Sequence, residues 1–496
     1  MNAKQRRLGA VFASIVAVVI LAMALLISLQ SSNHPWRVEE TATDSSVFIY
    51  IGREILRGRM PYRDTFDHKG PLIYLINVLA LLIPGRNGLW ILELASLAAA
   101  FALMYRAARL RCGRLAALIA LALAVGPLHI YYSRGNFTET FALPFIALGL
   151  YIFLDYFERD RVTRLRLAAC GFALGAVCLL RINMAALWIV MCLGVIARCA
   201  ARKSWSELGR FVLWFTAGLA AAVLPALAWL AANGAMGPFF EDYILFNLRY
   251  SAARGSDEAV WGFASVCKAF LLQRVTLLAT IMAAYYAVHT RRWLPVLYLS
   301  FLGLNLATVA MSGRMYNHYG IVLIPGLVFP LAWLCGDIER LLKGNLLATA
   351  MVLAYLVFAF SRPEWTYIFN DAGDMLGGRI TDRLDPEALR ITEVIDTHAA
   401  PGEDIVVCGN TDFFYNASNR FSATKYSYQT PPCLVDESLL RAFLSEMEER
   451  QPAVVLLPGD TEIRDEVMAF IDAHDYALVD HSDLYGCDLY ARDNGA

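Results

Sequence analysis

A short polar segment near the N-terminus holds acidic groups and a lysine that could do chemistry together. Asp44 begins the segment, and Asp64, Asp67, His68 and Lys69 lie in its last part. A carboxylate can accept the proton of an attacking hydroxyl group, and a lysine ammonium binds phosphate. Asp44 could instead cap a helix, and the other charges could belong to a solvated loop. The pattern predicts a site for proton and phosphate chemistry.

Further cations and polar groups lie at the ends of later apolar runs. The charge pattern described below places these loops on the same side of a membrane as Asp44, where arginine is disfavoured. Several arginines converging on one pocket could bind a phosphate or pyrophosphate, whereas each one alone could reach toward lipid headgroups. The candidates are Arg134 with Asn136 and Glu139, Arg181 with Asn183, and Arg314 with Tyr316, Asn317, His318 and Tyr319.

Motifs of several other chemistries are absent from the sequence. There is no P-loop, no dinucleotide-binding glycine motif, no HExxH and no G-x-S-x-G, so nucleotide-dependent and serine-hydrolase chemistry is unsupported. His68 has no second His or Cys nearby, and we predict no metal site, although a divalent-cation requirement stays open. The ten cysteines form no C-x-x-C pair, which argues against zinc. A disulfide between two of Cys408, Cys433 and Cys487 also stays open.

The composition indicates a protein embedded in a lipid bilayer. Of 496 residues, 58% are hydrophobic and 18% are charged, whereas a soluble domain has roughly 45–50% apolar and about a quarter charged residues. The apolar excess is concentrated before residue 361, in runs of the roughly 20 residues that a spanning helix needs. The fold class is therefore a polytopic α-helical membrane protein, and no nucleic-acid partner is expected.

Lysine and arginine collect in cytoplasmic loops, and this bias indicates the topology. The basic stretch Lys4–Arg7 places the N-terminus in the cytoplasm, followed by a retained first span over about residues 9–30 rather than a cleaved signal peptide. Later basic loops alternate with polar ones and predict about eleven spans, ending outside near residue 361. Glu93 is the one clear acidic residue within a span, so the carboxylate chain of a proton-coupled transporter is missing.

The polar segment is thus part of an outside loop over residues 31–87. The run 71–84 is too short to span a bilayer and fits a re-entrant or a surface helix. Upstream of it, apolar residues at helical spacing predict an amphipathic helix lying on the membrane surface. These residues are Val47, Phe48, Ile51 and Ile55.

The composition changes after Arg362 to that of a small soluble α/β domain. Residues 405–410 and 453–458 are short β-branched runs that predict strands, and 437–449 and 464–474 predict helices. We therefore expect a transmembrane catalytic domain over residues 1–361 and an extracytoplasmic domain over 362–496, on the same side as the polar segment.

The motifs of the polar segment resemble a known class of membrane enzymes. An Asp ends the first span, a glycine-containing amphipathic helix follows, and Pro-Tyr-x-Asp and Phe-Asp-x-Lys-x-Pro-Leu precede a short apolar helix. This arrangement resembles the GT-C class of polytopic glycosyltransferases. It is most similar to the branch of the protein O-mannosyltransferases and the lipid A aminoarabinose transferase. Ser45 follows Asp44 where the protein mannosyltransferases have Glu, which argues against protein O-mannosylation.

The resemblance implies a bacterial inner-membrane enzyme that takes a sugar from a polyprenyl-phosphate carrier. The acceptor would be a cell-envelope glycan, lipid or protein on the outer face. Asp44 would be the general base, Asp67 the second acidic catalytic residue and Lys69 the contact to the leaving phosphate. Arg314 and His318 would belong to a later loop that faces the same phosphate. Arg134 and Arg181 are the other phosphate-binding candidates, and the remaining site candidates are Tyr62, Asp64, His68, Glu139 and Tyr316.

A different class of protein stays open as an alternative. A transporter or flippase of lipid-linked sugars would also need outward-facing arginines, but it would have less use for an external α/β domain. Removal of the Asp44 carboxylate separates the two hypotheses, because transfer requires the base whereas transport does not.

Overall fold

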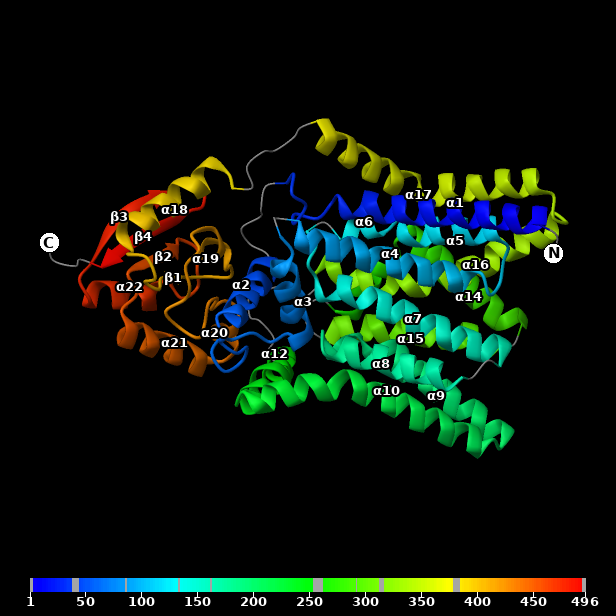
Figure 1. Ribbon diagram of the computed structural model, residues 1–496, viewed down its shortest axis with the longest axis horizontal. Helices are drawn as coiled ribbons and strands as arrows, with labels where there is room; N and C mark the ends of the chain where they lie inside the picture. The colour runs from blue at the N-terminus through cyan, green and yellow to red at the C-terminus, as the bar shows by residue number, and fades with distance from the viewer. Residues whose placement is uncertain are drawn as a thin grey trace. The chain divides into compact units, whose positions relative to one another are not determined.

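A computed structural model describes residues 3–37, 44–84, 87–132, 134–160, 163–252, 262–290, 292–311, 316–377 and 384–492. The chain divides into two compact units, each built from three segments (Figure 1). We call Met1–His34, Trp90–Ala226 and Arg254–Gly378 the helical unit. We call Pro35–Leu89, Leu227–Ala253 and Arg379–Ala496 the mixed unit.

Long apolar helices that lie side by side form the helical unit (Figure 1). Pairs adjacent in the sequence, such as α7 with α8 and α14 with α15, pack on each other, and α16 packs on α5. The helices are α1 (Ala3–Ser28), α4 (Gly88–Ala108), α5 (Arg114–Val125), α6 (Leu128–Tyr131), α7 (Thr138–Arg159), α8 (Arg164–Cys178), α9 (Ala186–Arg202), α10 (Trp205–Ala232, which continues into the mixed unit), α13 (Phe263–Val266), α14 (Arg274–Thr290), α15 (Trp293–Met311), α16 (Ile324–Leu341) and α17 (Leu346–Gly377).

The described residues include nine helices long and apolar enough to cross a membrane, or ten if the bent pair Phe263–Leu271 and Arg274–Thr290 is one span. The chain is therefore a polytopic helical membrane protein, as its composition predicts. The predicted fifth span corresponds to α8, which has 15 residues and is shorter than the roughly 20 that a perpendicular span needs. The count of about eleven spans stays a prediction.

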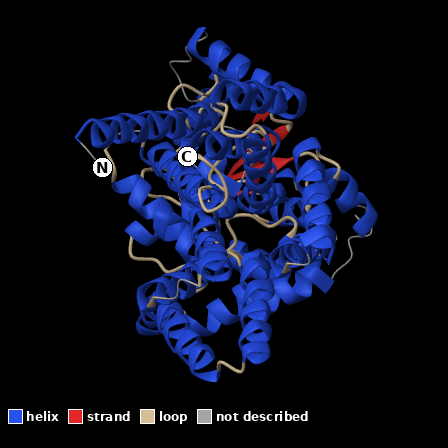
Figure 2. Cartoon of the chain, turned by 90° about the vertical axis from the view of Figure 1, so that its right-hand side faces the viewer, coloured by secondary structure: helices blue, strands red, loops and turns tan. Residues whose placement is uncertain are grey.

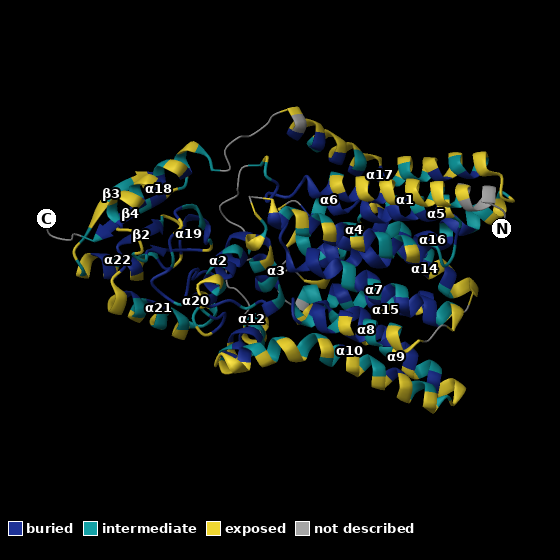
Figure 3. Ribbon diagram, viewed as in Figure 1, coloured by how far each residue is buried: buried dark blue, intermediate teal, exposed yellow. Residues whose placement is uncertain are grey.

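The helices of this unit differ in how much of their surface other helices cover (Figure 3). The spans Thr138–Arg159 and Asn317–Leu341 are mostly buried, whereas few residues of Trp205–Ala232 and Leu346–Met375 are buried. Exposed leucine, valine and isoleucine side chains cost nothing in hydrocarbon, so the helices that carry them are suited to face lipid.

Helix α17 passes through the predicted domain boundary at residues 361–362. It runs without a break from Leu346 to Gly377, with Pro363 inside it. Ile368, Ala372 and Met375 remain buried beyond that point, so an apolar face continues past the change in composition. Asn370 and Asp374 of the same helix are exposed, whereas Glu364 is buried and accepts a hydrogen bond from Gln273.

The mixed unit combines short helices with a small sheet, whose strands are red in Figure 2. Strands β1 (Val406–Val407) and β2 (Val454–Pro458) are parallel, whereas β4 (Cys487–Arg492) is antiparallel to β2 and to β3 (Tyr476–Ser482), in the order β1-β2-β4-β3. The two predicted strands and both predicted helices are confirmed. The helices are α2 (Asp44–Leu56), α3 (Pro71–Leu82), α11 (Met236–Phe239), α12 (Phe246–Ala252), α18 (Pro386–His398), α19 (Phe413–Ala417), α20 (Pro432–Val435), α21 (Glu437–Arg450) and α22 (Arg464–Ala473).

Helix α2 is covered by protein on its apolar face, contrary to the expectation that this face enters lipid. Val47, Phe48 and Ile51 are at most 5% exposed. The ring of Phe48 lies 6.2 Å from that of Tyr74 on α3, and that of Tyr50 lies 5.1 Å from a tyrosine of α19. The helix that the apolar spacing predicts is confirmed, but such spacing does not distinguish a protein partner from a lipid one.

Candidate functional site

The loop between α2 and α3 is held by buried tyrosines. Pro71 is the first residue of α3, where its fixed φ suits a helix start and its missing N–H leaves no donor unpaired. The buried hydroxyl of Tyr62 donates a 2.7 Å hydrogen bond to the carbonyl of Lys69, and Tyr74 lies 3.2 Å from the same oxygen. These contacts determine the position of the residues just before α3.

Asp64 belongs to a turn in this loop. Its Oδ2 accepts a 2.7 Å bond from the backbone N–H of Met60. Its two oxygens also accept bonds of 3.0 and 2.7 Å from Arg63. The bond from the guanidinium of Arg63 is the main reason that the pKa of Asp64 lies below its ordinary value. Such contacts stabilise the turn, and a further role for Asp64 stays a prediction.

Asp67 is buried, and both of its carboxylate oxygens accept hydrogen bonds. Oδ2 accepts a 2.7 Å bond from Tyr74. Oδ1 accepts bonds of 2.8 Å from Tyr428 and 2.6 Å from the backbone N–H of His68. A buried carboxylate is stable as an ion when donors surround it in this way. The arrangement favours a positioning role, because its lone pairs are engaged within the protein.

Hydrogen bonds connect Lys69 to Asp67 through two intervening side chains. The ammonium of Lys69 lies 3.0 Å from Nε2 of His68, and Nδ1 of the same ring lies 3.2 Å from the hydroxyl of Tyr428. An ammonium can only donate, so Nε2 is the acceptor and Nδ1 carries the ring proton. Tyr428 then accepts from His68 and donates to Asp67. His68 is therefore neutral and oriented in this chain.

No carboxylate of the described residues pairs directly with the side-chain nitrogen of Lys69. The residue is 8% exposed, and its hydrogen-bond partner is the neutral ring of His68. Within the described ranges, no Asp or Glu oxygen lies within 4.0 Å of its Nζ. A desolvated cation of this kind gains stability when an anion binds to it.

Asp44 is the first residue of α2 and is half-buried. The positive end of a helix dipole stabilises a carboxylate there. The pKa of Tyr428 is raised mainly by burial. The negative charges of Asp67 and, to a smaller extent, of Asp44 raise it further. Asp44 and Asp67 therefore lie within electrostatic range of the same hydroxyl group. Asp44, Asp67, His68 and Lys69 all belong to the mixed unit, and their catalytic and binding roles stay predictions.

Several residues of this site carried no recognisable sequence signal. Tyr428 comes from the C-terminal part of the chain, and Asn247 of α12 donates a 2.7 Å bond to the carbonyl of His68. Tyr250 of the same helix stacks on the His68 ring at 5.4 Å. A tyrosine and an asparagine without a motif cannot be assigned to a site that lies hundreds of residues away in the sequence.

Two further acids of the mixed unit have raised pKa values. Burial raises the pKa of Asp242 to about 6, although Lys425 opposes this effect from 3.0 Å. Burial raises the pKa of Asp412 to about 8, although its Oδ2 accepts a 2.7 Å bond from Ser427. Asp412 therefore keeps its proton at neutral pH.

The helical unit has its own polar cluster at the start of α7. Arg181 donates a 2.8 Å bond to Oε1 of the buried Glu139 and a 2.9 Å bond to the hydroxyl of Tyr319. Its guanidinium also lies 4.6 Å from the centre of the Tyr319 ring. The structure brings Arg181 and Glu139 together as an ion pair, which reduces the charge that Arg181 could offer to a phosphate.

The other predicted residues of this unit occupy different environments. His318 stacks between the rings of Phe137 and Tyr316, at 4.5 and 5.5 Å. Arg134 is exposed, and its carbonyl accepts a bond from Ser32. Arg314 lies outside the described residues. The predicted convergence of the arginines on one pocket stays a prediction.

Glu93 is fully buried and paired within the helical unit. Its oxygens accept a 3.0 Å bond from Asn33 and a 2.9 Å bond from Tyr132, and also the backbone N–H of Asn136. The carboxylate therefore holds the loop before α7. No group of three or more His, Cys, Asp or Glu residues in the described part of the chain could hold a metal ion.

A family model described as "Putative competence-induced protein Ccs4 N-terminal domain" matches residues 5–331. No curated protein sequence matches the chain. Among solved structures, ArnT from Cupriavidus metallidurans bound to undecaprenyl phosphate has a TM-score of 0.62 at 13% identity, over 100% of this chain and 99% of that one. AglB, an oligosaccharyltransferase from Archaeoglobus fulgidus solved with an inhibitory peptide and a dolichol-phosphate, has a TM-score of 0.53 at 14% identity, over 97% of this chain and 75% of that one. The predicted GT-C class is confirmed at the level of the fold, and the branch within the class stays a prediction.

Proposed function

Because the chain belongs to the Ccs4 N-terminal-domain family and has the GT-C fold, we propose that it is a membrane glycosyltransferase using a lipid-phosphate-linked sugar. The donor is a monosaccharide on a polyprenyl phosphate. The acceptor is a cell-envelope glycan, lipid or protein on the outer face of a bacterial inner membrane. The ArnT and AglB structures support this proposal, since they hold undecaprenyl phosphate and a dolichol-phosphate.

The proposed reaction is a single displacement at the anomeric carbon. The acceptor hydroxyl attacks this carbon while the bond to the carrier phosphate breaks. Asp44 accepts the proton of the hydroxyl group as general base. Lys69 neutralises the charge that develops on the departing phosphate. No nucleotide is required, because the lipid phosphate is itself the leaving group.

The burial and the hydrogen-bond partner of Lys69 are the main observation in support of this proposal. Its ammonium is desolvated and contacts the neutral ring of His68, in the same unit as Asp44. By contrast, Arg181 is paired with Glu139 at 2.8 Å. We therefore assign the phosphate contact to Lys69 and a structural role to Arg181. Asp67 positions Lys69 through Tyr428 and His68 and does not itself accept the proton.

The test is sugar transfer by the full chain reconstituted in liposomes. Short-chain polyprenyl-phosphate monosaccharides serve as donors and envelope glycans as acceptors. We expect Asp44→Asn to lower kcat by about 100-fold or more, because this change removes the base and keeps its shape. Lys69→Met should reduce kcat/KM by a similar factor, and Lys69→Arg by less.

Arg441→Gln is the matched control, since it removes an exposed cation elsewhere in the mixed unit and should leave transfer nearly unchanged. Transfer that is indifferent to both Asp44→Asn and Lys69→Met would show that the site is misplaced. Folded protein that turns over no donor but moves a lipid-linked sugar across the bilayer would favour the transporter.

A further inference from the structure

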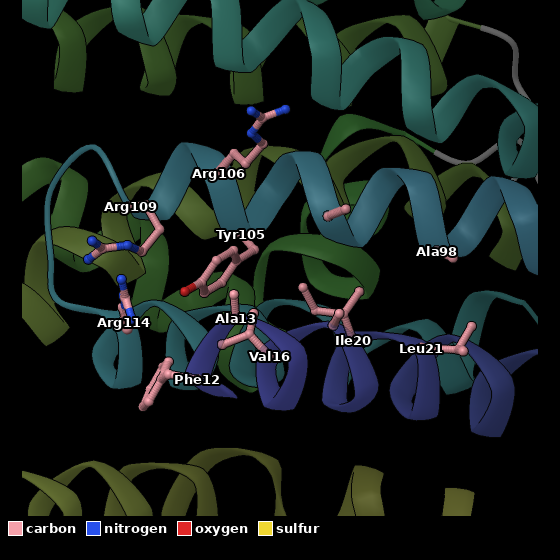
Figure 4. A pocket seen from close by; sticks show the side chains of 12 residues that line it. Phe12, Ala13, Val16, Ile20, Leu21, Ala98, Tyr105, Arg106, Arg109 and Arg114 are labelled. Atoms are coloured by element: carbon pink, nitrogen blue, oxygen red, sulfur yellow. The ribbon is translucent and has the colours of Figure 1, made fainter. Parts of the chain in front are cut away.

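A cavity lies in the helical unit between α1 and α4 (Figure 4), with a volume of about 680 Å³. Its walls are apolar and include small residues of both helices, among them Ala13, Ala17, Ala98 and Ala102. Small side chains on facing helices leave the space between them open. Nothing in the proposed transfer reaction uses this space.

One end of the cavity is cationic. In Figure 4 the guanidinium groups of Arg109 and Arg114 and the hydroxyl of Tyr105 gather there, whereas the head of Arg106 points away from α1. Arg106 lies 5.9 Å from the centre of the Tyr151 ring, so it lines the cavity with its stem.

The two clustered arginines have no acidic partner in the described ranges. Arg109 donates to the carbonyl of Cys112, and Arg114 lies 5.2 Å from the centre of the Phe12 ring. Glu339 accepts a 2.6 Å bond from the backbone N–H of Gly113, the residue before α5. Within the described ranges, that carboxylate forms no ion pair with either guanidinium group.

We propose that this cavity binds one anionic glycerophospholipid of the surrounding bilayer. Arg109 and Arg114 match the charge of its phosphate, with Tyr105 as a further donor, and the apolar walls accept the first part of an acyl chain. A lipid can enter from the side, because Leu21 lines the cavity and is itself 52% exposed on the surface of α1. The occupant comes from the leaflet itself, independently of the donor and the acceptor.

Native mass spectrometry of the full chain tests the proposal by counting the lipids that the protein retains after extraction with phosphatidylglycerol, phosphatidylcholine or a short-chain polyprenyl phosphate. Wild-type protein should retain one phosphatidylglycerol in preference to phosphatidylcholine. The double variant with Arg109→Gln and Arg114→Gln (the arginine variant) should retain about tenfold less phosphatidylglycerol. Ala17→Leu/Ala102→Leu fills the cavity, keeps both charges, and should abolish the bound lipid.

The matched control is Lys203→Gln/Arg210→Gln, which removes two exposed cations of the same unit far from the cavity lining. It should leave retention unchanged. Three results would overturn the proposal: equal retention of both lipids, equal loss in the control and the arginine variant, or a preference for polyprenyl phosphate over phosphatidylglycerol. If the arginine variant fails to fold, full retention by the cavity-filling variant would be decisive against the proposal.

Discussion

At the scale of single residues, the hydrogen-bonded chain from Lys69 to Asp67 separates two opposite charges. A direct ion pair would neutralise both groups and leave little attraction for a phosphate. The neutral His68 and Tyr428 lie between the charges, so the carboxylate is satisfied in the interior while the ammonium remains a cation. This separation makes Tyr428 a positioning residue.

Replacement of Tyr428 by Phe tests this role. The ring packing survives, but Asp67 loses one donor and Nδ1 of His68 loses its acceptor. We expect the donor KM to rise and kcat/KM to fall by about tenfold, equivalent to roughly 1.4 kcal/mol. Tyr426→Phe is the matched control, because no hydrogen bond of its hydroxyl contributes to the chain. Equal kinetics of Tyr428→Phe and wild type would remove Tyr428 from the site.

Asp412 should make the stability of the protein depend on pH. Its pKa is about 8 in the folded protein, whereas an unfolded Asp titrates near about 3.9. Between these values the folded chain binds a proton that the unfolded chain has lost. The free energy of unfolding is therefore highest at low pH as far as Asp412 is concerned. It falls as the pH rises toward about 8, by up to about 1.4 kcal/mol per pH unit.

Asp412→Asn cannot ionise and should flatten the melting temperature between about pH 5 and pH 8. The variant should also melt above wild type at the upper end of this range. Asp472→Asn changes an exposed acid and should reproduce the wild-type slope. A wild-type slope in Asp412→Asn would show that this carboxyl is ionised in the folded protein.

At the scale of elements, glycines set how closely helices of the helical unit approach. A Cβ added at Gly171 of α8 would collide with the carbonyl oxygen of Phe215 on α10. A Cβ at Gly218 of α10 would likewise collide with the backbone of Ala168. Close backbone approach of this kind drives helix association in a membrane, where apolar burial gives no advantage.

Gly171→Ala should therefore lower the free energy of unfolding by about 1–3 kcal/mol through overpacking. Gly209→Ala lies on α10 where a Cβ meets no atom within 4 Å, and it should stabilise the helix by roughly 0.5–1 kcal/mol. Thermal unfolding in detergent measures both. If Gly171→Ala were as stable as Gly209→Ala, close contact of α8 and α10 would be excluded.

At the scale of the molecule, the C-terminal region does not form a compact unit alone. It shares the mixed unit with Pro35–Leu89 and Leu227–Ala253. Arg53 of α2 donates bonds of 2.8 Å to the carbonyl of Tyr415, 3.1 Å to Asn416 and 2.7 Å to Asn419. These bonds join segments more than 350 residues apart in the sequence, and we expect them to open together.

Arg53→Ala should accelerate amide hydrogen exchange in both α2 and α19. The loss of hydrogen bonds to a charged group corresponds to about 1.5–3 kcal/mol, or roughly ten- to a hundredfold in local opening. Exchange in the helical unit should not change. Arg441→Ala removes an exposed pair with Glu437 and serves as control. Faster exchange in α2 alone would mean that the segments open independently.

Patterns that are local in the chain were sufficient for the membrane class, the strands at 405–410 and 453–458, and the cluster of Asp67, His68 and Lys69. Length, hydropathy and neighbouring charges are properties of adjacent residues, and they keep their meaning in any fold. The pairing of Arg181 with Glu139, the protein cover on α2 and the contact of Tyr428 with Asp67 depended on tertiary structure. Each of them joins residues far apart in the chain, whose types are compatible with many partners until packing selects one.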